Sequence, residues 1–172
     1  NGIASLNLHT NLDCCPGGVN DVLASRLGLA DIEILNPVGT DAKGRPYGLV
    51  RIGEAAEQPL AEFAAFVKRV LSCPGVRFSD AGKPVRKVAV GGGSCGSEIG
   101  DVIAAGCDTF VTADLKYNHF EEAKYRGLNL IDAGHFETEN PVCAVLERVV
   151  REALPELTVL RAKAHKDETQ FL

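Results

Sequence analysis

Short apolar strands alternate with helices through the second half of the chain, and this alternation restricts the fold more than any other sequence feature. The strand-like runs are residues 85–90, 109–112 and 128–131. The segments with helical spacing are residues 97–105, 117–125 and 141–154. Strands separated by helices pair mainly in parallel, because such a connection has to cross a face of the sheet. We therefore expect an α/β fold with mixed, largely parallel sheets flanked by helices.

The first half of the chain is less regular. Apolar side chains have helical spacing over residues 19–29, and Pro59 is well placed in the first turn of a second helix. The expected buried stripe of that second helix is Leu60, Phe63, Ala64, Val67 and Leu71. Further strands are expected at residues 3–8, 32–38 and 49–52, and near Val159. With no internal repeat or interdomain linker, the 172 residues suit one domain or a large part of a two-lobed one.

Composition and charge exclude several classes of protein. Apolar and charged residues make up 45% and 24% of the chain, as in an ordinary globular protein. A net charge of −5 argues against a nucleic-acid partner, and no apolar run or signal-peptide pattern indicates a membrane. The six cysteines include no CxxC pair, which argues against a zinc ribbon and is typical of reduced thiols. We expect a cytoplasmic protein without nucleic-acid or membrane partners.

The clearest chemical signal follows the strand at residues 128–131. His135 and Glu139 lie four residues apart, so their imidazole and carboxylate share one face of a helix and can grip one cation. An earlier strand end, with His9 and Asp13, offers further side chains of the ligand type. The simpler alternative is a helix start at which acidic residues are favoured by the helix dipole, with Asp13 as a turn residue.

A glycine-rich loop follows the strand at residues 85–90 and consists of Gly91, Gly92, Gly93 and Ser94. It begins a formal GxGxxG pattern, and Asp114 ends the next strand roughly where the ribose-binding acid of a dinucleotide site would lie. Against such a site, the pattern is in mid-chain and is flanked by ligand-like loops that a dehydrogenase would not need. The loop is either an anion nest, with Lys116 to neutralise a phosphate, or tight strand–helix packing. Cys95 is disfavoured as a nucleophile because no His neighbours it in sequence.

The candidate residues share one position in the expected fold. In α/β sheets the loops at the carboxyl ends of the strands carry the ligands. Four such loops hold the residues singled out above, namely His9 and Asp13, the glycine loop, Asp114, and His135 with Glu139. We therefore expect these loops to form one site, and a metal site is the working hypothesis.

Several segments taken together resemble the Nif-three-like family, also known as type 2 homologues of GTP cyclohydrolase I. The matching segments are residues 9–13 (HTNLD) with 17–21 (GGVND), residues 112–117 (TADLKY) and residues 134–139 (GHFETE). They occur in the family's order and span nearly the whole chain, which also speaks against a Rossmann dehydrogenase. One departure is Asn118 before His119, because many relatives have the His directly after the Tyr.

The resemblance implies a two-lobed α/β protein that assembles into a ring-like homohexamer with two divalent metal ions in each subunit. It assigns Asp13, His135 and Glu139 as metal ligands, with Glu139 contacting both ions, and two further ligands to an upstream pair of adjacent histidines. This sequence has no adjacent histidines and starts at Asn1 without any Met. We therefore expect residues 1–172 to be the carboxy-terminal portion of such a protein, lacking its N-terminal part and the module inserted in some relatives.

The expected chemistry is attack of a metal-activated water on carbon or phosphorus. Oxygen and imidazole ligands suit Zn, Mn, Fe or Mg, and His9 and Asp114 are candidate catalytic residues. The resemblance suggests hydrolytic opening of the guanine ring of GTP. Two alternatives stay open: a non-catalytic, metal-binding oligomeric scaffold or regulator, and a metal-dependent nucleotide phosphoesterase.

Overall fold

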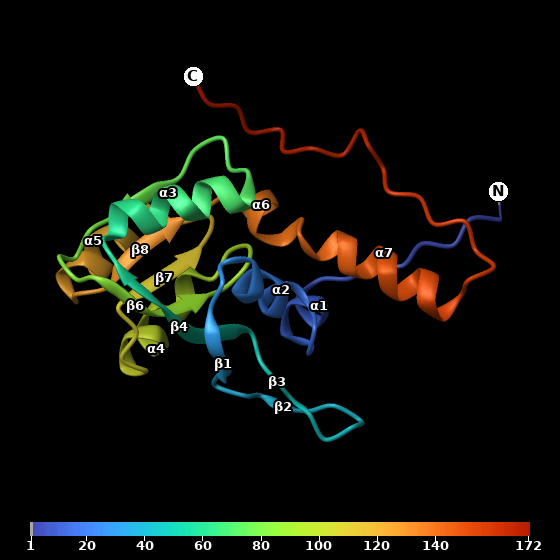
Figure 1. The fold of residues 1–172 in the computed structure, drawn as a ribbon, viewed down its shortest axis with the longest axis horizontal. Coiled ribbons are helices and arrows are strands. Elements are labelled where there is room, and N and C mark those ends of the chain that lie inside the picture. The colour runs from blue at the N-terminus through green and yellow to red at the C-terminus, as the bar shows by residue number, and fades with distance from the viewer. Residues whose placement is uncertain (1) are drawn as a thin grey trace.

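A six-stranded mixed sheet forms the centre of the protein (Figure 1). The structure is a computed structural model that describes residues 2–172. The strand order is β1-β4-β6-β7-β8-β5. Its parallel strands are β6 (Val85–Val90), β7 (Thr109–Thr112) and β8 (Asn129–Asp132). Its antiparallel strands are β1 (Ala30–Leu35), β4 (Val50–Gln58) and β5 (Arg77–Ser79). The predicted α/β fold with a mixed sheet is confirmed, and the parallel pairing lies at its centre.

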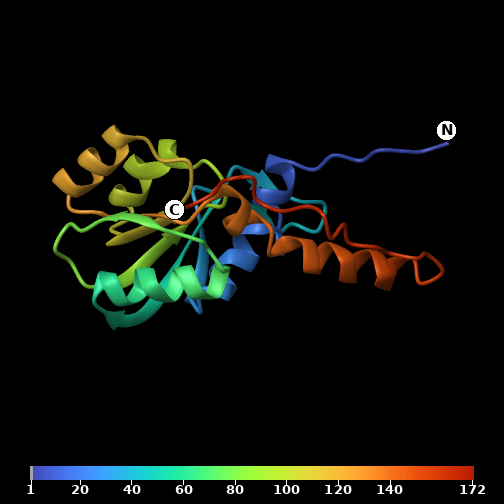
Figure 2. The same cartoon turned by 90° about the horizontal axis from the view of Figure 1, so that it is seen from above.

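Helices cover both faces of this sheet, because side chains alternate between the two faces along each central strand. Val88 and Val90 face a cluster that includes Phe63 and Leu23, from α3 (Leu60–Leu71) and α2 (Val19–Arg26). Ala89 lies in a second cluster, with residues of α4 (Ile99–Ala104) and α5 (Tyr117–Tyr125). Figure 2 shows α3 on one side of the sheet and α4 and α5 on the other. The core is therefore a three-layer α/β/α arrangement.

The predicted helices and strands of residues 85–154 all form, with shifts of one or two residues at most ends. The helix expected at residues 97–105 is divided into a 3-10 turn, η1 (Gly96–Glu98), and α4. In the first half, the strand at residues 49–52 is part of the longer β4, and residues 39–47 contain a small hairpin of β2 (Gly39–Thr40) and β3 (Pro46–Tyr47).

Two predicted strands are wrong. Residues 3–8 are extended but pair with no strand of the described chain, and they lead into the short helix α1 (Thr10–Cys14). The segment around Val159 is likewise irregular. In both places an apolar run is exposed and lacks a neighbouring strand, and strand pairing rather than local sequence decides whether such a run forms a strand.

Parts of both terminal segments line one cavity beside the two helices that follow β8, with Leu6 and Leu8 from the N-terminal segment and His165 from the C-terminal one. After β8 come α6 (His135–Glu139) and α7 (Val142–Ala153), and α7 projects from the body of the sheet alongside the N-terminal segment (Figure 1). The C-terminal segment then returns toward the sheet (Figure 2). There the His165 ring lies 5.1 Å from the Phe136 ring, centroid to centroid, and Phe171 packs over Gly75. Within residues 2–172, no helix is long and apolar enough to cross a bilayer.

A buried arginine ties the first helices to the sheet. Arg51 on β4 is 1% exposed and pairs with the Asp21 carboxylate on α2. Its guanidinium also donates to the carbonyl oxygens of Gly48, at 2.6 Å, and Cys14, at 3.2 Å. A planar fork with several donors suits these three acceptors, which a lysine could not satisfy together. Arg51 therefore fixes the position of α1, and with it the position of Asp13.

We expect Arg51→Met to lower the free energy of unfolding by about 3 kcal/mol, because it leaves the half-buried carboxylate of Asp21 and two carbonyls without the guanidinium that donates to them. Denaturant unfolding measures this loss. The matched control is Arg86→Met on β6, whose pair with Glu57 spans 3.3 Å between exposed side chains and should contribute less than about 1 kcal/mol. Equal losses of unfolding free energy in the two variants would contradict the stabilising role of the buried Arg51.

Candidate metal centre

The loops after the three parallel strands lie next to one another at one edge of the sheet. The glycine loop follows β6, Asp114 follows β7, and Gly134 with His135 follows β8. The backbone connects them directly, because the Ala113 amide donates to the Gly93 carbonyl and the Ala133 amide to the Thr112 carbonyl, both at 2.9 Å. The sequence prediction that these loops share one edge is correct for the three loops after β6, β7 and β8, whereas His9 and Asp13 follow a segment that forms no strand in the described chain.

His135 uses both of its ring nitrogens. Its Nδ1 lies 2.7 Å from Asp114 Oδ2, and its Nε2 lies 3.1 Å from Glu139 Oε1. The second pair joins positions i and i+4 of α6, so the spacing seen in the sequence does bring imidazole and carboxylate together. Burial lowers the pKa of His135, but the hydrogen bond with Asp114 and the charge of Glu139 outweigh it and leave the pKa above its ordinary value.

Asp114 acts as the orienting partner of that ring. Its φ of +53° is left-handed, a conformation that costs a non-glycine residue energy, and it points the carboxylate at Nδ1 of His135. A carboxylate that accepts from Nδ1–H leaves Nε2 as the coordinating nitrogen, which is how many metal-bound histidines are held. The sequence predicts Asp114 as a catalytic residue, and the structure places its carboxylate 2.7 Å from Nδ1 of His135.

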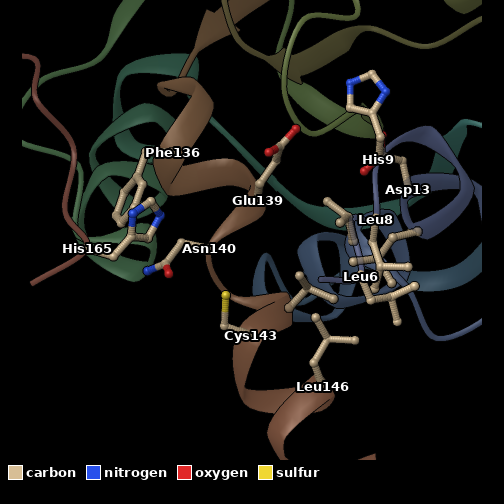
Figure 3. A pocket seen from close by; sticks show the side chains of 13 residues that line it. Leu6, Leu8, His9, Asp13, Phe136, Glu139, Asn140, Cys143, Leu146 and His165 are labelled. Carbon is tan, nitrogen blue, oxygen red and sulfur yellow. The ribbon is translucent and has the colours of Figure 1, made fainter. Parts of the chain in front are cut away.

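Asp13 and His9 approach from α1 and the residue before it. Both line a cavity of about 330 Å³ together with Glu139, and Figure 3 shows Glu139 on the wall opposite His9 and Asp13. Burial and the charge of Glu139 raise the pKa of Asp13, while His9 and His135 act against this rise. Asp13 and Glu139 are therefore near enough to repel each other, and a cation between them would relieve that repulsion.

The donor set suits a divalent cation but is incomplete. Carboxylate oxygen and imidazole nitrogen are ligands that Zn, Mn, Fe and Mg accept, and Nε2 of His135 already lies beside Glu139 Oε1. Over residues 2–172, however, no three His, Cys, Asp or Glu side chains lie close enough to hold an ion together. The residues present therefore fit part of a metal centre, as the resemblance implies when it assigns further ligands to adjacent histidines that this sequence lacks.

The glycine loop packs tightly and offers few free donors. The Gly91 amide donates to Val111 O, Gly92 to Asn20 Oδ1 and Gly93 to Thr138 Oγ1, at 2.7 to 3.0 Å. An anion nest needs several free amides, so these contacts favour the packing interpretation over the predicted anion site at Gly91, Gly92, Gly93 and Ser94. Burial also raises the pKa of the Cys95 thiol to about 12, which argues against a nucleophile there.

Lys116, the other residue predicted to bind an anion, lies at the start of α5. It is exposed, and its backbone amide donates to Nδ1 of His119 at 3.2 Å. The His119 ring in turn packs against Gly96. These contacts give His119 a role in the local structure of the helix start.

Two buried polar residues that sequence reasoning missed hold the site together. Asn20, 0% exposed, donates from Nδ2 to the carbonyls of Asp13 and Leu49 and accepts the Gly92 amide at Oδ1. Thr138 accepts the Gly93 amide and donates to the Gly134 carbonyl. The sequence places Asn20 in the expected helix at residues 19–29 and in the matching segment 17–21, and nothing local shows that it reaches the glycine loop.

Fold and site define an α/β protein with a candidate cation site at the carboxyl edge of its parallel strands. The chain belongs to the NIF3 family, because the family model for Duf34/NIF3 (NGG1p interacting factor 3) matches residues 1–168. The resemblance drawn from residues 9–13, 112–117 and 134–139 is thus confirmed.

Curated relatives named GTP cyclohydrolase 1 type 2 homolog match most of the chain. The one from Nostoc sp. is 36% identical over 152 residues, which are 87% of this chain and 56% of the relative. The one from Clostridium perfringens is 30% identical, over 100% of this chain and 66% of the relative. The one from Streptomyces coelicolor is 42% identical, over 83% and 52%. The chain therefore spans about half to two thirds of the length of these relatives.

Solved structures share the fold. A Staphylococcus aureus hypothetical protein matches with a TM-score of 0.85 and 27% identity, over 96% of this chain and 67% of that chain. A Bacillus cereus protein related to NIF3 matches with a TM-score of 0.82 and 24% identity, over 95% and 72%. The second likeness concerns the fold alone.

We expect Asp114→Asn to lower the pKa of His135, because an amide removes the negative charge that stabilises the imidazolium at Nδ1. NMR titration of the metal-free protein measures this, since the chain has only four histidines to assign. The other three imidazoles in the same spectra are the internal reference. An unchanged His135 midpoint would show that the contact with Asp114 does not govern the ring.

Gly93→Ala should destabilise the site. Gly93 has a φ of +65°, and a Cβ there would lie 2.5 Å from Glu139 Oε1 and 3.1 Å from His135 Nε2. The left-handed backbone alone costs roughly 1–2 kcal/mol with a side chain, and the clash displaces Glu139. Gly100→Ala, in α4 with open space around it, is the control and should be neutral or stabilising in denaturant unfolding. Equal behaviour of the two variants would contradict the close packing.

Proposed function

We propose that this chain contributes Asp13, His135 and Glu139 to a dinuclear metal centre of a hydrolase. The observation that carries the proposal is the geometry at His135, whose Nδ1 is held by Asp114 at 2.7 Å while Nε2 lies 3.1 Å from Glu139 Oε1. In the protein without a metal, one proton on Nε2 lies where a cation would be bound. The proposal assigns the remaining metal ligands to residues that are not in this sequence.

Each of the site residues has a defined part in the proposed mechanism. His135 and Glu139 bind from one helix, Asp13 binds from the opposite wall, and Asp114 orients the imidazole. His9, on the Asp13 side of the cavity, is the group that moves a proton to or from the substrate. Bound divalent ions would supply Lewis acidity toward water and toward the electrophile.

The proposed substrate is a nucleotide, and the reaction is hydrolytic opening of its ring. This part rests on the names of the relatives, which are GTP cyclohydrolase 1 type 2 homologues, and on a cavity at the site whose volume is in the range of small-molecule sites. A metal-dependent phosphoesterase would use the same ligands on the phosphate end of a nucleotide instead.

A metal-binding scaffold without turnover is the second candidate, and exposed apolar side chains at the end of α7 favour it. Val149, Val150 and Leu154 at the end of α7 are 37–48% exposed. Apolar side chains gathered in this way suit an interface between subunits. The homohexamer expected from the family resemblance is part of this proposal, and light scattering of the purified protein tests it.

The first experiment is the metal content of the full-length protein beside its Glu139→Gln variant. We expect about two ions per subunit and their loss with the Gln, because an amide cannot supply the negative charge. The matched control is Glu137→Gln on the same short helix, whose carboxylate lies against Gly134 and should leave the metal content unchanged. Retention of metal in Glu139→Gln, or its loss in both variants, would overturn the ligand assignment.

A turnover screen with nucleotides and phosphoesters then separates the candidates. A ring-opening hydrolase converts the nucleotide ring without releasing phosphate, whereas a phosphoesterase releases phosphate. Either enzyme loses its activity in folded, assembled Glu139→Gln protein. A scaffold shows no turnover with any metal.

A further inference from the structure

A second cavity adjoins the candidate metal centre and is lined by the C-terminal segment. It has a volume of about 430 Å³ and shares Phe136, Asn140, Cys143 and His165 with the first cavity. Beyond these shared residues it is lined by Leu160, Arg161, Ala162 and Lys166. Figure 3 shows Phe136, His165, Asn140 and Cys143 on the side of the first cavity away from His9 and Asp13. The two cavities therefore form one elongated groove along α6 and the start of α7.

The charge of this groove changes sign along its length. The end beside the metal centre carries the carboxylates of Asp13 and Glu139, and no Lys or Arg lines the first cavity among residues 2–172. The far end carries the cationic side chains of Arg161 and Lys166. The rest of the first cavity is lined mostly by apolar side chains, with Leu6 and Leu8 on the side of His9 and Asp13 and Phe136 toward the far end (Figure 3). A ligand that fits must have an uncharged middle and an anionic end.

The two cationic side chains have hydrogen-bond donors that are not used within the described part of the chain. Within the described residues, neither Arg161 nor Lys166 forms an ion pair with a carboxylate, and Arg161 donates one hydrogen bond, from Nη2 to Asn140 Oδ1 at 2.7 Å. A guanidinium has five N–H donors, so most of the Arg161 fork is free to bind phosphate. The glycine loop, in contrast, already uses the amides of Gly91, Gly92 and Gly93 internally.

We propose that Arg161 and Lys166 form the phosphate subsite of this groove, so that a nucleotide binds with its phosphates on the C-terminal segment and its ring toward Asp13 and Glu139. The inference rests on the proposed function and adds the orientation of the substrate. It assigns the ring end to the metal centre, which favours reaction at the ring over hydrolysis of a phosphoester. The charged C-terminal segment at residues 161–168 is thereby part of the proposed site.

The test compares binding of GTP and guanosine by calorimetry on the full-length, metal-free protein. Without metal, any preference for the triphosphate has to come from side chains. We expect GTP to bind more tightly than guanosine, and Arg161→Ala/Lys166→Ala to weaken GTP roughly 10-fold or more, because charge-assisted hydrogen bonds are lost. Guanosine binding should not change. The matched control is Lys163→Ala, which removes a charge from the same segment without touching the groove.

Three results would overturn the subsite: GTP binding that is unaffected in the double variant, an equal loss for GTP and guanosine, or an equal loss in Lys163→Ala. Failure of both ligands to bind the wild-type protein would overturn it as well. Metal content measured on the same proteins before the metal is removed keeps this test separate from the proposed function, because a protein that binds its ions but lacks the phosphate preference contradicts only the subsite.

Discussion

The site depends on one buried amide, the side chain of Asn20. It contacts the Asp13 carbonyl and Leu49 carbonyl through Nδ2 and the Gly92 amide through Oδ1, with no exposed surface. An amide is the side chain that can donate and accept in opposite directions at one position. Through these bonds α1, the start of β4 and the glycine loop keep one arrangement. Because a buried polar group that loses a partner is costly, the network selects this arrangement over nearby alternatives.

Thr138 extends this network to α6. Its hydroxyl accepts the Gly93 amide and donates to the Gly134 carbonyl, so the glycine loop lies directly against the helix that carries His135 and Glu139. The two walls of the cavity are thus joined through backbone atoms rather than through the candidate ligands themselves. Such an arrangement holds the candidate ligands in place through hydrogen bonds that do not involve the imidazole of His135 or the carboxylate of Glu139.

The fold could be predicted further than the site because its signals are local. The strand at Val85–Val90 and the helix at Tyr117–Tyr125 follow from apolar spacing within a few residues. The i,i+4 pair His135 and Glu139 is local in the same sense. The contacts that complete the site are distant: Asn20 to Gly92 joins residues 72 apart, and Thr138 to Gly93 residues 45 apart. No spacing rule encodes such pairs, and the failed strand at residues 3–8 shows the same limit.

The two ends of the groove carry charges of opposite sign. Two carboxylates, Asp13 and Glu139, face each other across one end, where burial and mutual repulsion raise the pKa of Asp13. A fold that holds like charges together in this way gains stability when a cation joins them, and such clusters are typical of functional sites. At the other end Arg161 and Lys166 are cations without carboxylate partners among the described residues. If the proposed metal ions neutralise the first end, both ends would attract anions, and the apolar walls of the groove limit how much of a ligand can be charged. A nucleotide then binds in the proposed orientation only if its phosphates gain more from the free guanidinium fork of Arg161 than from the metal ions.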